Sequence, residues 1–189
     1  MSPASASAQL ARPLPSPPRI DHWPRAVRSA EMLRGTLVRC GPGLRLVGWP
    51  ETPRVRAHAL APWYGTGHNA AIRMTAAWIW GAARSPGHPL EFSTTRGRRA
   101  ESTPGSEHAL HQFSYESDEI HSLGEFQLTT PLRTVADVLR IPGEFSRAHR
   151  VACRLLVQLI PGGTDAVRDR LTTVGPAYRA AAVSRLRQL

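Results

Sequence analysis

The apolar and polar positions of the first fifty residues predict a short helix and a hairpin after a proline-rich start. Residues 1–21 combine several prolines with serine and alanine, a composition typical of disorder, so we expect a disordered leader there. A short helix is predicted from Pro24, which suits a first turn, to about Leu33, with Gly35 ending it. This unit, residues 22–50, is the first predicted structured domain.

The hairpin follows from two apolar-rich runs, 36–40 and 44–49, that flank the turn Gly41-Pro42-Gly43. A helix followed by a hairpin is the outline of the last helix and wing of a winged-helix DNA-binding domain. A purely structural hairpin fits the same pattern equally well. The sequence alone leaves these two interpretations open.

Residues 51–189 predict a second domain, with a mixed central region and a helical tail. Helices are expected over 53–63 and around 75–81, where Thr75 would cap the start and Gly81 the end. Apolar, β-branched and aromatic positions predict strands at 90–94, 110–115 and 126–128. The chain as a whole is therefore expected to be α+β: a short helix plus β-hairpin, a central mixed α/β region and an α-helical C-terminus.

The helical tail begins with the clearest helix signal in the chain. Thr130 is placed to cap it and Pro131 to occupy its first position. Its apolar residues recur at i, i+3, i+4 and i+7, which predicts one buried face. Helices over 144–159, 165–171 and 177–186 are expected to follow.

The 144–159 segment has two distinguishable faces. Its arginines Arg147, Arg150 and Arg154 lie on one of them, which is either a second basic binding face or simply solvated. The predicted apolar face consists of Phe145, Ala148, Ala152, Leu155, Leu156 and Leu159.

The charge of the chain points to an anionic partner. Its formal net charge is +10, and every basic residue other than histidine is an arginine. Without lysine there is no Walker-type phosphate lysine, no Schiff base and no nuclease site of the D…(D/E)xK type. Arginine is suited to bidentate contacts with phosphate and guanine. We therefore expect DNA or an acidic protein surface as the partner.

The arginines are concentrated toward the two ends of the chain. Residues 1–63 hold nine arginines and three acidic residues, residues 64–143 hold seven and eight, and residues 144–189 hold eight and three. The predicted contacts with DNA are Arg25, Arg28, Arg39 and Arg45, with Arg147, Arg150 and Arg154 as a second basic face.

Catalytic and metal-binding motifs are weak. Gly65–Ala70 matches G-x-G-x-x-A, but Pro62 just before it does not suit the buried strand that a nucleotide-binding turn requires. His108 and His111 would point to opposite faces of a strand, so we expect no metal site. The acidic group Glu116, Asp118 and Glu119 is interpreted as a solvated turn, or else as a counter-charge for the basic segments or a contact for a basic partner. Cys40 and Cys153 are interpreted as core residues. No cofactor and no catalytic residue is predicted.

The chain shows no targeting or membrane signal. No run of about 18 apolar residues is present, so no membrane partner is expected. The first residues lack a basic start and an apolar stretch, and we expect a cytoplasmic protein.

Three segments, 39–46, 75–81 and 128–137, together resemble the AbiEi-type antitoxins of type IV toxin–antitoxin (abortive-infection) systems, in the actinobacterial variety. The third segment is the most specific, because it resembles the (V/L)T-x-x-R-T-x-x-D helix start of that family. The motif residues in this chain are Thr130, Arg133, Thr134 and Asp137. From their spacing, Arg133 and Asp137 are also expected to tie the helix to neighbouring backbone.

The resemblance implies a winged helix that binds promoter DNA, here truncated to one helix before the wing. It also implies an antitoxin domain, over residues 51–189, that represses or counters a nucleotidyltransferase toxin. We therefore expect a non-catalytic antitoxin or transcriptional regulator that binds DNA, counters a toxin protein, or does both. The alternatives are a protein-binding module without DNA binding and, least favoured, a degenerate nuclease.

Overall fold

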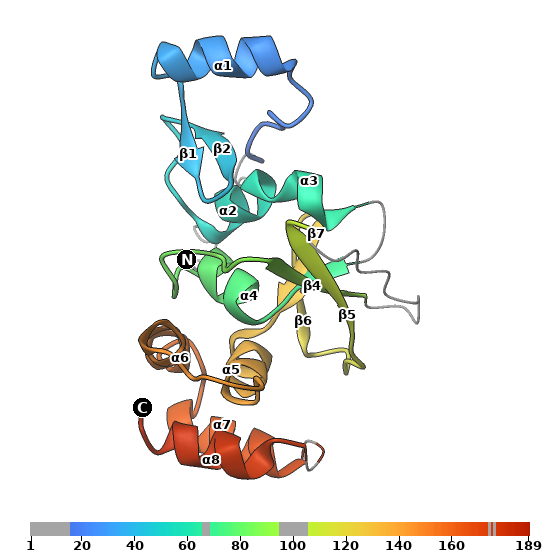
Figure 1. The fold of residues 1–189 in the computed structure, drawn as a ribbon, viewed down its shortest axis with the longest axis vertical. Helices are drawn as coiled ribbons and strands as arrows, with labels where there is room; N and C mark the ends of the chain where they lie inside the picture. The colour runs from blue at the N-terminus through green and yellow to red at the C-terminus, as the bar shows by residue number, and fades with distance from the viewer. Residues whose placement is uncertain (1–15, 66–68, 95–105, 174, 176) are drawn as a thin grey trace, which may run out of the picture.

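The computed structural model describes residues 16–65, 69–94, 106–173, 175 and 177–189, which contain eight helices and seven strands. These elements follow one long axis (Figure 1), with α1 at one end, α7 and α8 at the other, and a mixed sheet between them. The α+β class predicted from the sequence is confirmed, including the N-terminal helix and hairpin and the helical C-terminus.

The N-terminal unit consists of α1 (Arg25–Leu33) and a hairpin of β1 (Leu37–Cys40) and β2 (Gly43–Leu46). Gly35 adopts a left-handed φ of 78° just after the helix, as expected for a glycine that ends one. The strands are antiparallel, and Leu37 pairs with Leu46. None of the residues of α1 is buried, so this helix lies on the surface of the molecule.

The hairpin turn packs tightly against the rest of the protein. A Cβ added to Gly41 would lie 2.7 Å from Cζ2 of Trp78, and one added to Gly43 would lie 1.9 Å from the backbone oxygen of Ala59. The Gly-Pro-Gly sequence therefore serves close packing as well as the turn itself. The hairpin is anchored to the body at its tip, while α1 lies beyond its open end (Figure 1).

Replacing Gly43 by alanine should therefore lower the free energy of unfolding by about 1–3 kcal/mol, because the added methyl group overlaps a backbone oxygen. Gly48→Ala is the matched control, since a Cβ at that position meets nothing within 4 Å. Urea denaturation of both variants measures the difference. Equal stability of the two variants would mean that the hairpin tip does not pack closely on Ala59.

Two short helices connect the hairpin to the sheet. They are α2 (Pro53–Ala59), capped by the hydroxyl of Thr52, which accepts from the backbone N–H of Val55, and α3 (Ala61–Tyr64). The sequence predicted one continuous helix over 53–63. The helix breaks at Leu60 instead, because Pro62 has no N–H to continue the helical hydrogen bonds.

The central sheet has five strands in the order β5-β4-β3-β7-β6. The pairs β3–β7 and β4–β5 are parallel, and β3–β4 and β6–β7 are antiparallel. Its strands are β3 (Asn69–Ala71), β4 (Leu90–Thr94), β5 (His108–Gln112), β6 (Ile120–Leu123) and β7 (Phe126–Thr129). Strands β4 and β7 lie where they were predicted, β5 lies two to three residues earlier than expected, and β3 and β6 were not predicted.

Helix α4 (Arg73–Ile79) packs on the sheet, with Trp78 and Phe92 buried in the cluster between them. Thr75 does not cap this helix as predicted. Its hydroxyl donates to the carbonyl of Pro86 at 2.8 Å and accepts from the backbone N–H of Glu91 at 2.9 Å. The side chain therefore ties α4 to β4 and to the segment between them.

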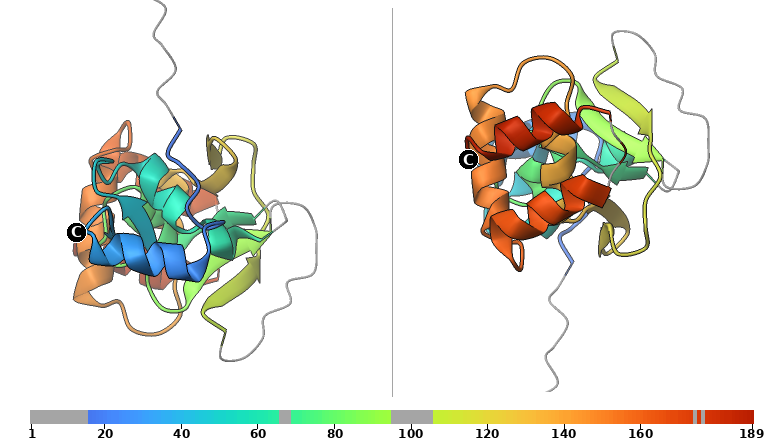
Figure 2. Two further views of the ribbon diagram at one scale, coloured as in Figure 1. Left: turned by 90° about the horizontal axis from the view of Figure 1, so that it is seen from above. Right: turned by 90° about the horizontal axis from the view of Figure 1, so that it is seen from below.

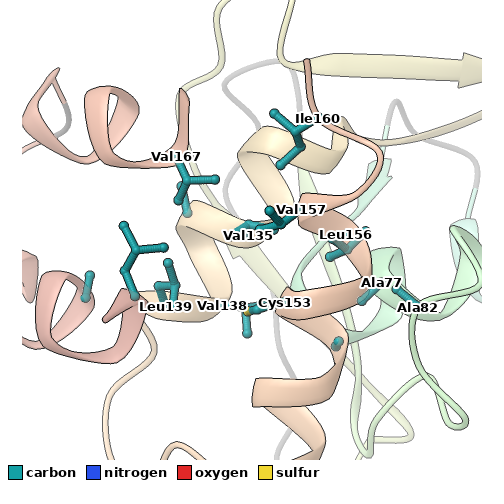
Figure 3. Packing of buried hydrophobic residues seen from close by; sticks show 14 of the residues in the cluster. Ala77, Ala82, Val135, Val138, Leu139, Cys153, Leu156, Val157, Ile160 and Val167 are labelled. Atoms are coloured by element: carbon teal, nitrogen blue, oxygen red, sulfur yellow. The ribbon is translucent and has the colours of Figure 1, made fainter. Parts of the chain in front are cut away.

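The C-terminal helices form a second buried cluster. They are α5 (Pro131–Leu139), α6 (Arg147–Val157), α7 (Gly163–Thr173) and α8 (Arg179–Leu186). Helix α5 lies at the centre of the cluster (Figure 3), where Val135, Val138 and Leu139 meet residues of α6, α7 and α8. Seen from below (Figure 2), α7 and α8 cover this end of the molecule. Both predicted core cysteines, Cys40 and Cys153, are buried.

Two sequence predictions need correction. Residues 1–15 of the predicted leader lie outside the described residues, but residues 16–21 pack on the body, with Pro17 and Ile20 buried and Arg19 paired with Glu125. On the predicted 144–159 helix, Ala148, Leu155 and Leu159 were expected on the buried face; Ala148 is instead exposed, and Leu155 and Leu159 are 49% and 51% exposed. No helix among the described residues is long and apolar enough to cross a membrane.

Candidate nucleic-acid interface

Most of the described arginines have a partner within the protein. Those without one are mostly the arginines that the sequence predicted to contact DNA. The partnered arginines bind carboxylates or backbone carbonyls, as Arg73 does with Glu91 at 2.8 Å and Arg185 with the carbonyl of Leu139 at 2.8 Å. Seven have no hydrogen bond, ion pair or ring contact with another described residue. They are Arg25, Arg28, Arg39, Arg84, Arg147, Arg150 and Arg187.

Helix α1 carries two of these arginines. Arg25 and Arg28 are three residues apart, so they are neighbours on the helix surface. Arg25 is exposed, and Arg28 is half-buried with its Nε covered and without a hydrogen-bond partner among the described residues. Arg39 is exposed on β1, opposite Leu44 of β2. These three guanidinium groups therefore belong to the helix–hairpin unit.

Two adjoining hollows connect this unit to the segment between α4 and β4. Arg28 and Arg39 line the first hollow, beside α1, and Arg39 and Arg84 line the second. Both hollows are also lined by Pro42 and the half-buried Trp63, so they adjoin. We call Arg25, Arg28, Arg39 and Arg84 the arginine strip.

Arg45, which was predicted to contact DNA, is instead engaged within the protein. Its Nη1 donates to the carbonyl of Trp49 at 2.8 Å and lies 3.2 and 3.3 Å from the carbonyls of Leu46 and Val47. Its Nε lies 3.5 Å from the carboxylate of Glu51. The side chain fixes the chain where it leaves the hairpin, which is a structural role.

The predicted second basic face is reduced in the same way. Arg154 of α6 donates from Nε to the carbonyl of Leu189 at 2.8 Å and from Nη2 to that of Gln188 at 3.1 Å, so it holds the C-terminal residues. Arg147 and Arg150 remain without a partner among the described residues. α6 lies nearer the opposite end of the molecule from α1 (Figure 1), so these two arginines are not part of the arginine strip.

The motif arginine Arg133 is buried in an ion network. Its Nε donates to Asp137 at 2.9 Å, and its Nη1 donates to Glu119 at 2.6 Å and to the carbonyl of Ser114 at 3.2 Å. Glu119 also pairs with Arg170 of α7. The predicted link from this helix to neighbouring backbone is confirmed for Arg133, whereas the side chain of Asp137 pairs with Arg133 itself. The network also extends further than the sequence indicated.

The pKa values of the two carboxyl groups in this network are shifted in opposite directions. Burial acts to raise the pKa of Glu119, but the backbone N–H of Glu116, the hydrogen bond from Arg170 and the charge of Arg133 lower it overall. Burial raises the pKa of Asp137 despite the adjacent Arg133. Glu119 is therefore an ionised, buried carboxylate, and its interpretation as part of a solvated turn is wrong. It is instead a counter-charge to Arg133 and Arg170, which was the alternative interpretation.

The remaining motif residues are also structural. The hydroxyl of Thr134 donates to the carbonyl of Thr130 at 2.8 Å and lies 2.7 Å from the hydroxyl of Thr129. Thr130 precedes α5 at the capping position, but its side chain makes no capping hydrogen bond. These contacts join β7 to the start of α5, so the motif organises the junction between the sheet and the C-terminal helices.

The described residues contain no group of three histidine, cysteine or acidic side chains that could hold a metal ion. His111 lies 3.5 Å from Glu91, whereas His108 contacts Ser106, so the two histidines have different neighbours. Residues 66–68 of the G-x-G-x-x-A match lie outside the described residues.

Arg84 and Trp63 are residues of the candidate interface that the sequence did not indicate. Arg84 is a single arginine after the end of α4, with no periodic pattern around it. Trp63 was expected in packing, and its Nε1 does donate to Glu107 at 3.1 Å, but it also lines both hollows beside the arginine strip.

Comparison with known proteins identifies no family. No family model matches the chain, and no curated protein matches it. A crystal structure of the RV2827C protein from Mycobacterium tuberculosis is similar, with a TM-score of 0.49 and 12% sequence identity, over 86% of this chain and 64% of that one. The chain thus spans less than two thirds of the length of that protein. A similarity of this size indicates no function.

Proposed function

We propose that this protein is a non-catalytic, DNA-binding regulator of the AbiEi-antitoxin type, and that the arginine strip contacts the phosphate backbone. The observation that carries the proposal is that the four arginines of the strip have no partner within the described part of the protein. Arg25, Arg28, Arg39 and Arg84 have no partner among the described residues, in a protein that engages most of its other arginines internally. Unpaired guanidinium groups close together attract phosphate strongly.

The position of α1 supports a role for it in contacting DNA. It contains no buried residue, lies at the end of the molecule and is followed directly by the hairpin (Figure 1). A surface helix can enter the major groove while an adjacent hairpin reaches the backbone beside it. The proposal that the protein also counters a nucleotidyltransferase toxin rests only on the family resemblance, of which the 128–137 segment is the most specific part.

Measuring the affinity of the full chain for duplex DNA at increasing salt tests this function. Four phosphate contacts give a slope of about −3.6 for log K against log [salt], so affinity should fall by about 100-fold between 50 and 200 mM salt. Fluorescence anisotropy with a labelled duplex of mixed sequence is sufficient, because phosphate contacts do not depend on base sequence. Absence of binding at the lowest salt, or a flat response, would reject the proposal.

A further inference from the structure

Helix α6 carries an apolar stripe on its exposed side. Val151, Leu155 and Leu159 are spaced four residues apart, so they lie on one face of the helix and of the turn that follows it. They are 43%, 49% and 51% exposed. Ala148, also exposed, continues the row by one turn. We call these four residues the α6 stripe.

The stripe is separate from the part of α6 that builds the core. Ala152, Cys153, Leu156 and Val157 are buried against α5 and its neighbours (Figure 3), so the inner face is complete without the stripe. Both views in Figure 2 place α6 at an outer edge of the molecule. A contiguous apolar row that the fold itself does not use is typical of a binding surface.

The charged residues of α6 itself are all arginines. Arg147 and Arg150 have no partner among the described residues, whereas the exposed Arg154 donates to the carbonyls of Leu189 and Gln188. The only acidic residue within the seven positions before α6 or within α6 itself is Glu144. A partner surface complementary to the α6 stripe therefore needs a row of apolar side chains with carboxylates along one edge.

We propose that the α6 stripe binds an acidic amphipathic helix of a partner protein. The apolar side chains of that helix would pack on Val151 and Leu155, and its carboxylates would pair with Arg147 and Arg150. A helix supplies both in the required geometry, because residues at i, i+3, i+4 and i+7 share a face. This surface is distinct from the arginine strip, and the inference does not depend on DNA binding.

Charge and composition favour this occupant over the others. A second copy packed through α6 would bring Arg147 and Arg150 of both copies together, in a chain whose net charge is already +10. A lipid surface is favoured by helices with broad, often aromatic, apolar faces, whereas this stripe is narrow and contains no aromatic residue. DNA offers no apolar groove that would match the exposed leucines.

The test uses the full chain and a labelled synthetic helical peptide with leucines at i, i+4 and i+7 and glutamates along one edge. We expect micromolar binding by fluorescence anisotropy, and weakening by about tenfold or more in Leu155→Ser and in Arg147→Glu/Arg150→Glu. Leu33→Ser, at a leucine that is 91% exposed on α1, is the matched control and should bind as the unaltered protein does.

The same variants distinguish the alternatives. A peptide with glutamine in place of every glutamate should bind about tenfold more weakly, since the arginine contacts are lost. Equal binding of the two peptides, or of Leu155→Ser and the unaltered protein, would overturn the proposal. Two further results would overturn the proposal if the peptide does not bind. Dimerisation that is lost in Leu155→Ser would assign the stripe to a second copy. Adsorption to vesicles containing phosphatidylserine that is lost in Leu155→Ser would assign it to lipid.

Discussion

Replacing Arg25, Arg28 and Arg39 together by alanine should lower the affinity for duplex DNA on the order of 100-fold at 0.1 M salt. Each of these residues supplies a guanidinium group that has no internal partner among the described residues, so its removal leaves no buried carboxylate uncompensated. The loss of affinity should be similar for unrelated DNA sequences, because contacts to phosphate do not depend on base sequence. The fold should be retained, because α1 buries no residue and Arg25 and Arg39 are exposed.

The matched control removes two exposed arginines that are outside the strip. Arg34 and Arg168 are 70% and 58% exposed and pair with acidic residues three positions away on the chain. Their double alanine variant should lose affinity by less than about tenfold, since only the general charge of the protein changes. Equal losses in the two variants would mean that net charge, and not the arginine strip, determines binding.

Replacing Glu119 by glutamine should lower the free energy of unfolding by about 3 kcal/mol at pH 7. Its carboxylate, only 8% exposed, pairs with both Arg133 and Arg170, and removing one member of a buried network leaves the other charges uncompensated. Glu125→Gln is the matched control, because Glu125 is 58% exposed and its pair with Arg19 should contribute less than about 1 kcal/mol.

The effect of Glu119→Gln should depend on pH in a defined direction. The folded protein lowers the pKa of Glu119, so the ionised carboxylate contributes stability that is fully present above the unfolded pKa of about 4.5. That contribution is lost as the pH falls through the lower, folded value. Urea denaturation should therefore show the gap between Glu119→Gln and the unaltered protein narrowing below about pH 4.5. A gap that widens there would contradict the assigned ionisation.

Local signals in the sequence were sufficient for several elements. Helix α1 ends at a glycine, the Gly-Pro-Gly turn produces the hairpin, and the apolar spacing of α5 marks its buried face. Strands β3 and β6 were missed because they have only three and four residues, and β3, Asn69-Ala70-Ala71, lacks the β-branched and aromatic residues typical of strands. Its place at the centre of the sheet is decided by pairing with β4 and β7, which are distant in sequence.

The sequence could suggest candidate arginines on the surface, but it could not show which arginines bind groups within the folded protein. Arg25, Arg28 and Arg39 were proposed because a helix and a hairpin with arginines suggest a basic surface, and all three have no partner among the described residues. Arg45 and Arg154 could not be separated from them, because their acceptors are backbone carbonyls whose positions depend on the folded chain. Glu119 was misassigned for the same reason, since Arg133 and Arg170 are 14 and 51 positions away.

The salt dependence of DNA binding by the Arg25/Arg28/Arg39→Ala variant tests the assignment of the arginine strip most directly. If these side chains neutralise phosphates, the slope of log K against log [salt] should fall in magnitude from about 3.6 to about 1, because only Arg84 of the strip remains. A variant that binds DNA with the same slope as the unaltered protein would place the phosphate contacts elsewhere on the molecule.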